Sequence, residues 1–167
     1  SMVFDASGKL LARAPQFSSG LSVVEVDLDK PDVAEVAPLS DRYEEMYGAL
    51  VLGTRDYVRK NKFTDVVIGL SGGIDSSIVA AVAVEALGAE HVHGVAMPSR
   101  YSSDGSKTDA YALAEALGID CRTISIEPVF EAYLSMLAPS FEGKAADLTE
   151  ENLQSRCRGQ ILMALSN

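Results

Sequence analysis

The chain has 167 residues, enough for one ordinary domain, and 47% of them are hydrophobic, which suffices for a packed core. The formal net charge of −10 opposes a broad nucleic-acid-binding surface, because such a surface needs clustered Lys and Arg. No apolar run reaches the roughly 18 residues of a membrane-spanning helix, and no signal-peptide pattern opens the sequence. The two cysteines, Cys121 and Cys157, lack metal-like spacing, so we expect structural cysteines and a soluble protein of the reducing cytoplasm.

Short β-strands are predicted within residues 1–30. Residues 1–4 and 9–14 flank a turn at residues 6–8, and residues 21–28 alternate apolar and polar side chains at period two. This pattern predicts two or three antiparallel strands, which are too few to fold alone. Residues 31–39 are predicted to be a linker because they hold two prolines and show no periodicity.

An amphipathic helix is predicted after residue 40. Its apolar residues recur at helical spacing and are Tyr43, Met46, Tyr47, Leu50, Val51, Tyr57 and Val58. We expect this stripe to pack against a core, and we favour that packing over an adenine platform built from the tyrosines.

Residues 65–77, DVVIGLSGGIDSS, are the most informative stretch of the chain. Residues 66–70 are apolar and begin with three β-branched side chains, which is typical of a central parallel strand covered on both faces. Ser71, Gly72 and Gly73 then remove large side chains where backbone N–H groups can approach an anion, and an apolar helix follows at residues 78–87. Neither the GxxxxGK[ST] loop nor the GxGxxG fingerprint is present. The sequence therefore predicts a phosphate-binding loop of a third kind.

Asp75 within this loop has two interpretations. A carboxylate beside a polyphosphate is repelled by roughly 4 kcal/mol per charge pair at 4 Å, unless a divalent cation lies between them. Mg²⁺ bound by one carboxylate, phosphate oxygens and water is the usual arrangement. The alternative is that Asp75 only caps a helix, as Ser71 and Ser76 could also do. Inside SGGIDSS we favour the metal.

Alternating helices and strands follow the loop. Helices are predicted at residues 107–117 and 129–137, and strands at residues 91–97 and 121–126. This alternation predicts a doubly wound parallel sheet, in which ligands bind at the carboxyl ends of the strands.

The loop at residues 97–110, MPSRYSSDGSKTDA, lies at such a strand end. It could surround adenosine, with Met97 at the base and Ser102 or Ser103 at the ribose or phosphate. By composition alone a solvated connection is the favoured interpretation. His91 and His93 share a strand face, but they have no third ligand nearby and are expected to be structural.

The last helix is predicted at residues 149–167, with Thr149 as its N-cap. Leu153, Cys157, Ile161 and Leu165 would form its apolar face. Asn152 and Arg156, four residues apart, could present an amide and a guanidinium to one polar ligand, with Arg158 as a second cation nearby. An exposed face with ordinary ion pairs is the alternative.

Three motifs in this order, GLSGGIDSS, MPSRYSSDGSKTDA and EENLQSRCRGQILMALSN, resemble the synthetase portion of the glutamine-dependent NAD synthetases, members of the ATP pyrophosphatase superfamily. Residues 1–30 resemble the closing strands of a nitrilase-like glutaminase domain. The resemblance implies a Rossmann-like adenine nucleotide alpha hydrolase fold in residues 40–167, of which only the first half is present. It also implies a glutaminase tail in residues 1–30 and a linker at 31–39.

The resemblance also implies site residues. The ATP and pyrophosphate site would be Gly69, Leu70, Ser71, Gly72, Gly73, Ile74, Asp75, Ser76, Met97, Ser102 and Ser103, with Mg²⁺ on Asp75. Asn152 and Arg156 would bind deamido-NAD. Leu148 stands where relatives place an aromatic residue, so ring stacking on the nicotinate would come from elsewhere. No protein nucleophile is expected.

The implied reaction is the ATP-dependent amidation of deamido-NAD to NAD, with release of AMP and pyrophosphate and with ammonia from glutamine. Because the glutaminase active site and a later ATP loop are absent, we expect residues 1–167 alone to be inactive, and we expect the complete enzyme to be a homo-oligomer. Another amidotransferase of the superfamily, such as GMP synthetase, or a non-catalytic ATP-binding module remains the alternative.

Overall fold

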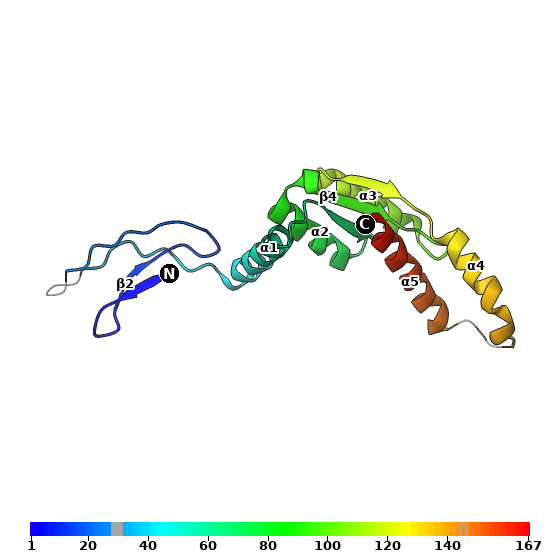
Figure 1. The fold of residues 1–167 in the computed structure, drawn as a ribbon, viewed down its shortest axis with the longest axis horizontal. Helices are drawn as coiled ribbons and strands as arrows, with labels where there is room; N and C mark the ends of the chain where they lie inside the picture. The colour runs from blue at the N-terminus through cyan, green and yellow to red at the C-terminus, as the bar shows by residue number, and fades with distance from the viewer. Residues whose placement is uncertain (28–31, 144, 146) are drawn as a thin grey trace. The chain divides into compact units, whose positions relative to one another are not determined.

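The computed structural model describes residues 1–27, 32–143, 145 and 147–167. Its backbone contacts divide the chain into two units, Ser1–Gly53 and Thr54–Asn167. The ribbon in Figure 1 runs from blue at the N-terminus to red at the C-terminus. Residue 28 of the predicted third strand and residue 31 of the predicted linker lie outside the described residues.

The first unit begins with a two-stranded antiparallel hairpin, β1 (Met2–Phe4) and β2 (Leu10–Arg13). The strand predicted at residues 21–28 is wrong for its described part, because residues 21–27 form no strand. The segment around Val36 takes that place instead: the N–H of Arg13 donates to the carbonyl of Glu35 at 3.1 Å, and the N–H of Ala37 donates to Arg13 at 2.9 Å. With this edge of β2 occupied, Leu21 and Val23 remain exposed.

Helix α1 (Arg42–Lys60) confirms the predicted helix, but not its packing. Asp41 caps it, accepting hydrogen bonds from the N–H groups of Tyr43 and Glu44. Val51 and Val58 are buried. The core packing expected for the rest of the stripe is wrong, because its other members are exposed: Tyr43, Met46, Tyr47, Leu50 and Tyr57. The helical periodicity correctly predicts that these residues share one face, but only the two valines on that face are buried.

The second unit is built on three parallel strands in the order β3-β4-β5: β3 (Val66–Leu70), β4 (Val92–Ala96) and β5 (Asp120–Thr123). Among the described residues β4 is the middle strand of this sheet, and β3 pairs with it in parallel. Helices cover both faces of β3, which explains why its residues are apolar throughout.

Helices cover both faces of this sheet, which confirms the doubly wound α/β fold. On one face α2 (Ile74–Leu87) and α3 (Asp104–Leu117) share a core with Leu70 and Val92. On the other, α4 (Glu127–Leu137) and α5 (Leu148–Leu165) enclose Val95 and Met97. Figure 1 shows α4 and α5 running alongside each other. Short 3₁₀ turns, η1 (Ala89–His91) and η2 (Ala138–Ser140), complete the unit.

Several helices begin earlier than predicted because their caps lie further upstream. Helix α2 begins directly after Gly73, and α3 begins after Ser103, whose Oγ accepts the N–H of Ser106. The predicted cap Thr149 is wrong: Asp147 caps α5, accepting the N–H of Thr149 at 2.7 Å, while Glu150 accepts the N–H of Asp147 at 2.7 Å. This reciprocal pair is a capping box.

The predicted apolar face of α5 is confirmed, with Cys157 buried and Leu153, Ile161 and Leu165 packed against the same cluster. Both cysteines are free, and burial raises the pKa of each thiol, as expected of structural residues. Within the described part of the chain, no helix combines the length and the apolar composition needed to cross a membrane.

Candidate functional site

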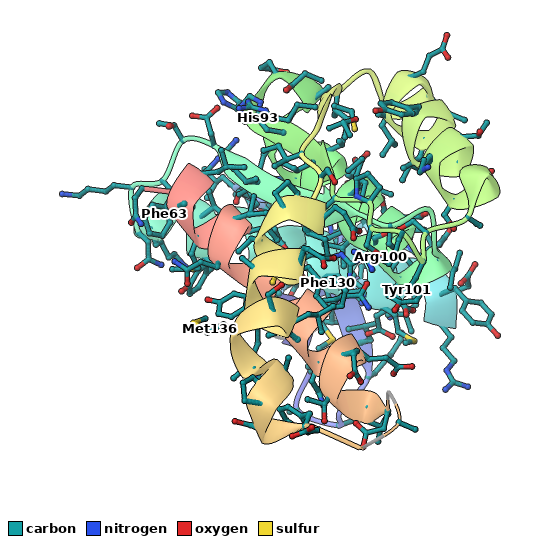
Figure 2. All side chains as sticks on the ribbon, turned by 90° about the vertical axis from the view of Figure 1, so that its right-hand side faces the viewer. Phe63, His93, Arg100, Tyr101, Phe130 and Met136 are labelled. Carbon is teal, nitrogen blue, oxygen red and sulfur yellow. The ribbon has the colours of Figure 1, made fainter. Side chains whose placement is uncertain are left out.

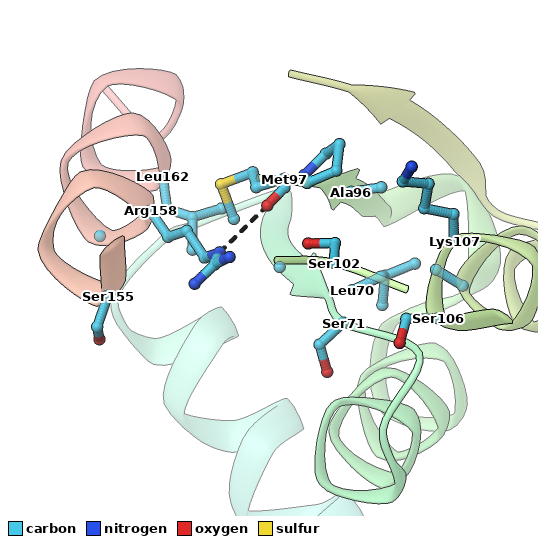
Figure 3. A pocket seen from close by; sticks show the side chains of 14 residues that line it. Leu70, Ser71, Ala96, Met97, Ser102, Ser106, Lys107, Ser155, Arg158 and Leu162 are labelled. Carbon is cyan, nitrogen blue, oxygen red and sulfur yellow. Dashed lines mark hydrogen bonds between the residues drawn. The ribbon is translucent and has the colours of Figure 1, made fainter. Parts of the chain in front are cut away.

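A cavity of about 510 Å³ lies at the carboxyl ends of β3 and β4. Figure 3 shows the side chains that line it. They come from the ends of these strands, from the loop after β4, from the first turns of α3 and from α5. The lining residues are Gly69, Leu70, Ser71, Ala96, Met97, Pro98, Ser102, Ser106, Lys107, Ala110, Ser155, Arg158, Gly159 and Leu162. The volume is in the range of small-molecule sites, and the position is where doubly wound sheets bind ligands.

The loop after β3 is shaped by its own serines. The Oγ of Ser76 donates to the carbonyl of Gly73 at 3.0 Å and accepts the N–H of Ser71 at 3.2 Å. The Oγ of Ser77 donates to the same carbonyl at 2.9 Å, and the N–H of Gly73 donates to Ser71. These bonds fix the turn directly before α2, whose first N–H groups have no partner within the helix. Such a turn at a helix start has the geometry of an anion-binding loop, and phosphate binding here stays a prediction.

Gly72 is required at its position for two reasons. Its φ of +77° lies in the left-handed region, and a Cβ there would stand 2.3 Å from the carbonyl oxygen of Ser106. The phosphate loop thus packs directly against the N-terminal turn of α3. Because Ser71 and Ser106 both line the cavity, this contact sets the distance between two of its walls.

The loop after β4 is held by hydrogen bonds from several elements. The N–H of Ile126 donates to the carbonyl of Pro98 at 3.1 Å, and the Nε of Arg158 donates to the carbonyl of Met97 at 3.1 Å. Figure 3 draws the Arg158 bond as a dashed line. The loop is therefore a fixed wall of the cavity, and its contact with adenosine stays a prediction.

The cavity is cationic although the chain is acidic. Lys107 and Arg158 line it, and none of its described lining residues is an Asp or a Glu. Partial burial lowers the pKa of the Arg158 guanidinium, which nevertheless stays protonated because arginine is not deprotonated in proteins. Its apolar surface, from Leu70, Met97 and Leu162, suits a planar ring. The arrangement can therefore hold a small ligand with an apolar ring and a polyanionic tail.

The structure brings together only part of the predicted site. Gly69, Leu70, Ser71, Met97 and Ser102 line the cavity. The other predicted phosphate-loop residues are not among the lining residues and form the turn and the first residues of α2: Gly72, Gly73, Ile74, Asp75 and Ser76. Ser103 caps α3 and is not among the lining residues.

Asn152 and Arg156, the predicted acceptor residues, lie on another face of α5. Nη1 of Arg156 donates to the carbonyl of Asn152 at 3.2 Å, and Arg156 lines a second hollow of about 490 Å³ between α4 and α5, with Tyr133 and Cys157. Among the described residues, neither of the two lines the cationic cavity.

Sequence reasoning did not include Lys107, Ser106, Ser155 and Gly159 in the site, and it placed Arg158 only near it. One sequence pattern indicates the α5 residues. Positions 155, 158, 159 and 162 share a helix face on which small, charged and apolar residues are mixed. Gly159 within a helix is a further indication, because glycine there is unfavourable unless the space is used.

His91 and His93 lie at the opposite, amino-terminal end of the sheet, as the label of His93 in Figure 2 shows. Nδ1 of His93 lies 2.5 Å from Oδ1 of Asp120, and Nε2 lies 3.3 Å from Oδ1 of Asp65. Nδ1 of His91 also lies 3.3 Å from Asp65. No group of three or more His, Cys, Asp or Glu side chains in the described part of the chain is arranged to bind a metal, and these histidines contact the carboxylates of Asp65 and Asp120 instead.

A parallel α/β sheet with a glycine-rich phosphate loop and an adjoining cationic cavity defines the second unit as a nucleotide-binding domain. The family model for NAD synthase matches residues 46–167, and the chain belongs to this family.

Known proteins resemble the chain over nearly all of its length. It is 47% identical to the glutamine-dependent NAD(+) synthetase of Synechocystis sp., over 100% of the chain and 30% of that protein. The structure of glutamine-dependent NAD+ synthetase from Acinetobacter baumannii in complex with ADP aligns with a TM-score of 0.91 and 42% identity, over 96% of the chain and 31% of that protein. The NMN synthetase of Francisella tularensis aligns with a TM-score of 0.64 and 33% identity, over 73% and 49%. The chain thus spans about a third of the length of the glutamine-dependent relatives it matches.

Proposed function

We propose that the protein to which these residues belong is an ATP-dependent ligase that amidates deamido-NAD to NAD, with ammonia from glutamine. The cationic cavity beside the SGGIDSS loop carries the proposal, because it pairs an apolar surface with an anion site, as the two ends of ATP require. The proposal of ATP as the ligand is also supported by membership of the NAD synthase family and by the ADP complex of the Acinetobacter relative.

In the proposed reaction a carboxylate oxygen of the acceptor attacks the α-phosphorus of ATP. The bond from that phosphorus to the bridging oxygen breaks, and pyrophosphate leaves. Ammonia then attacks the acyl carbon, the bond to the AMP oxygen breaks, and the amide forms after loss of a proton. The residues of this chain contribute positioning and charge neutralisation, with Lys107 and Arg158 at the polyanion.

Mg²⁺ on Asp75 belongs to this proposal. Asp75 is exposed in the first turn of α2, next to the phosphate loop. One carboxylate fits a metal that takes its remaining ligands from phosphates and water. When bound, the ion would neutralise charge on the leaving pyrophosphate. We also propose a homo-oligomeric cytoplasmic enzyme, in keeping with the free cysteines.

The test measures AMP and pyrophosphate produced by the full-length gene product with ATP, Mg²⁺ and either glutamine or ammonia. Three acceptors are compared: deamido-NAD, nicotinic acid mononucleotide and xanthosine monophosphate. We expect AMP with deamido-NAD. AMP with the mononucleotide alone would make the protein an NMN synthetase, like the Francisella relative, and AMP with xanthosine monophosphate alone would make it a GMP synthetase. ATP binding without AMP would leave only a nucleotide-binding module.

A further inference from the structure

The loop after β4 is joined to α5 by a hydrogen bond that is buried at both ends. Oγ of Ser99 donates to Oε1 of Gln154 at 2.8 Å. Ser99 is 9% exposed and Gln154 is 8% exposed, and they are the two buried polar residues in the described part of the chain. Breaking a buried hydrogen bond leaves one partner unsatisfied, and this costs more than losing a bond on the surface.

Ser99 organises the turn that carries Ser102 into the cavity. The N–H of Ser99 donates to Oγ of Ser102 at 3.0 Å, and the N–H of Ser102 donates back to the carbonyl of Ser99 at 3.0 Å. Oγ of Ser99 also accepts the N–H of Tyr101 at 3.3 Å. Ser102 lines the cavity, whereas Ser99 and Gln154 are not among its lining residues. A shift of Ser99 would therefore move Ser102.

The same loop is held from its other side by α4. The Arg100 guanidinium pairs with Glu127 and Glu131, and it lies 6.0 Å from the centre of the Phe130 ring. Figure 2 shows Arg100 and Tyr101 beside Phe130. These carboxylates and the guanidinium are largely solvent-accessible, and such pairs contribute little net stability. The N–H of Arg100 also donates to Oε2 of Glu127 at 2.8 Å. The buried bond to α5 restrains the turn from the opposite side.

We propose that Gln154 is a positioning residue for ATP, which through Ser99 holds the 99–102 turn against the nucleotide; this proposal rests on the proposed function. Helix α5 would then fix the loop at two points. Arg158, one turn after Gln154, holds the carbonyl of Met97, and Gln154 itself holds Ser99. Asn152 and Arg156 belong to a different face of α5, so the contact should act on ATP and hardly on the acceptor.

The experiment compares Ser99→Ala, Gln154→Met and the double variant in the full-length gene product. Each single change removes the bond between Ser99 and Gln154, and methionine keeps the length of the glutamine side chain. Ser99→Ala also removes the longer bond from the N–H of Tyr101, so the double variant is compared with Ser99→Ala. We expect the KM for ATP to rise about tenfold in each single variant, since that is the effect of one such bond. We expect no further rise in the double variant, because the bond can be lost only once. The KM for the acceptor should stay within about twofold.

Gln160→Met is the matched control for ATP, because Gln160 is exposed on the same helix and lines the second hollow, with Arg156, rather than the cationic cavity. Its KM for ATP should remain unchanged. Calorimetric titration with ADP, at a temperature where every variant is folded, gives a measurement that does not depend on turnover. Ser99→Ala removes a single oxygen, so it serves if Gln154→Met fails to fold.

An unchanged KM for ATP, or effects of the two changes that simply add, would overturn the positioning role. Equal changes in the ATP and acceptor KM values would also overturn it, since they indicate a general loss of structure. If the wild type binds ADP but makes no AMP with any acceptor, the proposed function fails. The ADP titrations then decide the role of Gln154 separately.

Discussion

Gly72→Ala tests whether the phosphate loop depends on its close contact with α3. The added Cβ would stand 2.3 Å from the carbonyl oxygen of Ser106 and 2.9 Å from its Cα, whereas ordinary contacts begin near 3.4 Å. The loop and α3 would have to separate by about 1.1 Å, a shift comparable in size to those that disable catalytic sites. Backbone atoms form both sides of the contact, so no side-chain rotation relieves it.

The cost has two parts. A left-handed conformation at a φ of +77° costs an alanine about 1–2 kcal/mol. Overpacking in a close-packed region costs a further 1–3 kcal/mol. If the separation is taken up in the ATP complex, the combined 2–5 kcal/mol corresponds to a loss of at least about 30-fold in kcat/KM for ATP.

Gly118→Ala is the matched control for Gly72→Ala. Gly118 ends α3 with a φ of +69°, but the nearest atom to its added Cβ is the Cβ of Ala89 at 4.0 Å. It therefore carries the backbone cost without the collision, and it lies outside the cavity lining. Steady-state kinetics and urea unfolding of both variants separate the cost of the left-handed backbone from the cost of the collision with Ser106. The reasoning is refuted if both variants lose equal stability and Gly72→Ala keeps its kcat/KM for ATP.

Three further outcomes are expected. Asp75→Asn should reduce Mg²⁺-dependent AMP formation at least about 100-fold with an unchanged urea midpoint, because the side chain is exposed; full activity would remove the metal assignment. The hydrogen bond to Asp120 raises the pKa of His93, so its contribution to stability is complete below the unfolded pKa and is lost as pH rises through the folded value; the urea midpoint should fall between pH 6 and pH 9, and His93→Gln should reduce that fall. Phe130→Ala, at a fully buried residue, should lower the free energy of unfolding by about 3–5 kcal/mol, measured by urea denaturation, and a loss below 1 kcal/mol would contradict its place in the core.

The order of strands and helices in the second unit could be predicted because local patterns decide it. Residues 66–70 are apolar enough to need cover on both faces, and Gly118 ends a helix in the left-handed conformation that glycine favours. Helix starts were less predictable, since Gly73 and Asp147 compete as caps with neighbouring Ser and Thr residues of similar propensity.

Burial could not be predicted from periodicity alone. Residues 21–27 alternate like a strand, yet β2 already bonds to the segment around Val36. The stripe on α1 has helical spacing, yet Tyr43 is 79% exposed. In both cases the pattern states which residues share a face, while tertiary contacts decide whether another element covers that face.

In the candidate site, too, the residues that are adjacent in the sequence could be predicted, whereas those brought together by the fold could not. SGGIDSS identifies an anion-binding loop because the glycines and the helix start are adjacent in the sequence. Lys107 and Arg158 are 51 positions apart, and only the fold places both at one cavity. Ser99 and Gln154 show it again: neither belongs to a nucleotide-binding pattern, and their bond spans 55 positions.

The net charge of −10 and the cationic cavity together favour a small anionic ligand over an extended one. An extended polyanion such as RNA would need a basic surface along its whole length, and it would meet the acidic exterior of this chain. A nucleotide of the proposed kind would instead enter a cavity of about 510 Å³, where Lys107 and Arg158 would act at short range. Charge-neutralising Lys107→Gln should therefore weaken ATP binding more at low salt than at high salt, and equal effects at both would mean that Lys107 does not act through its charge.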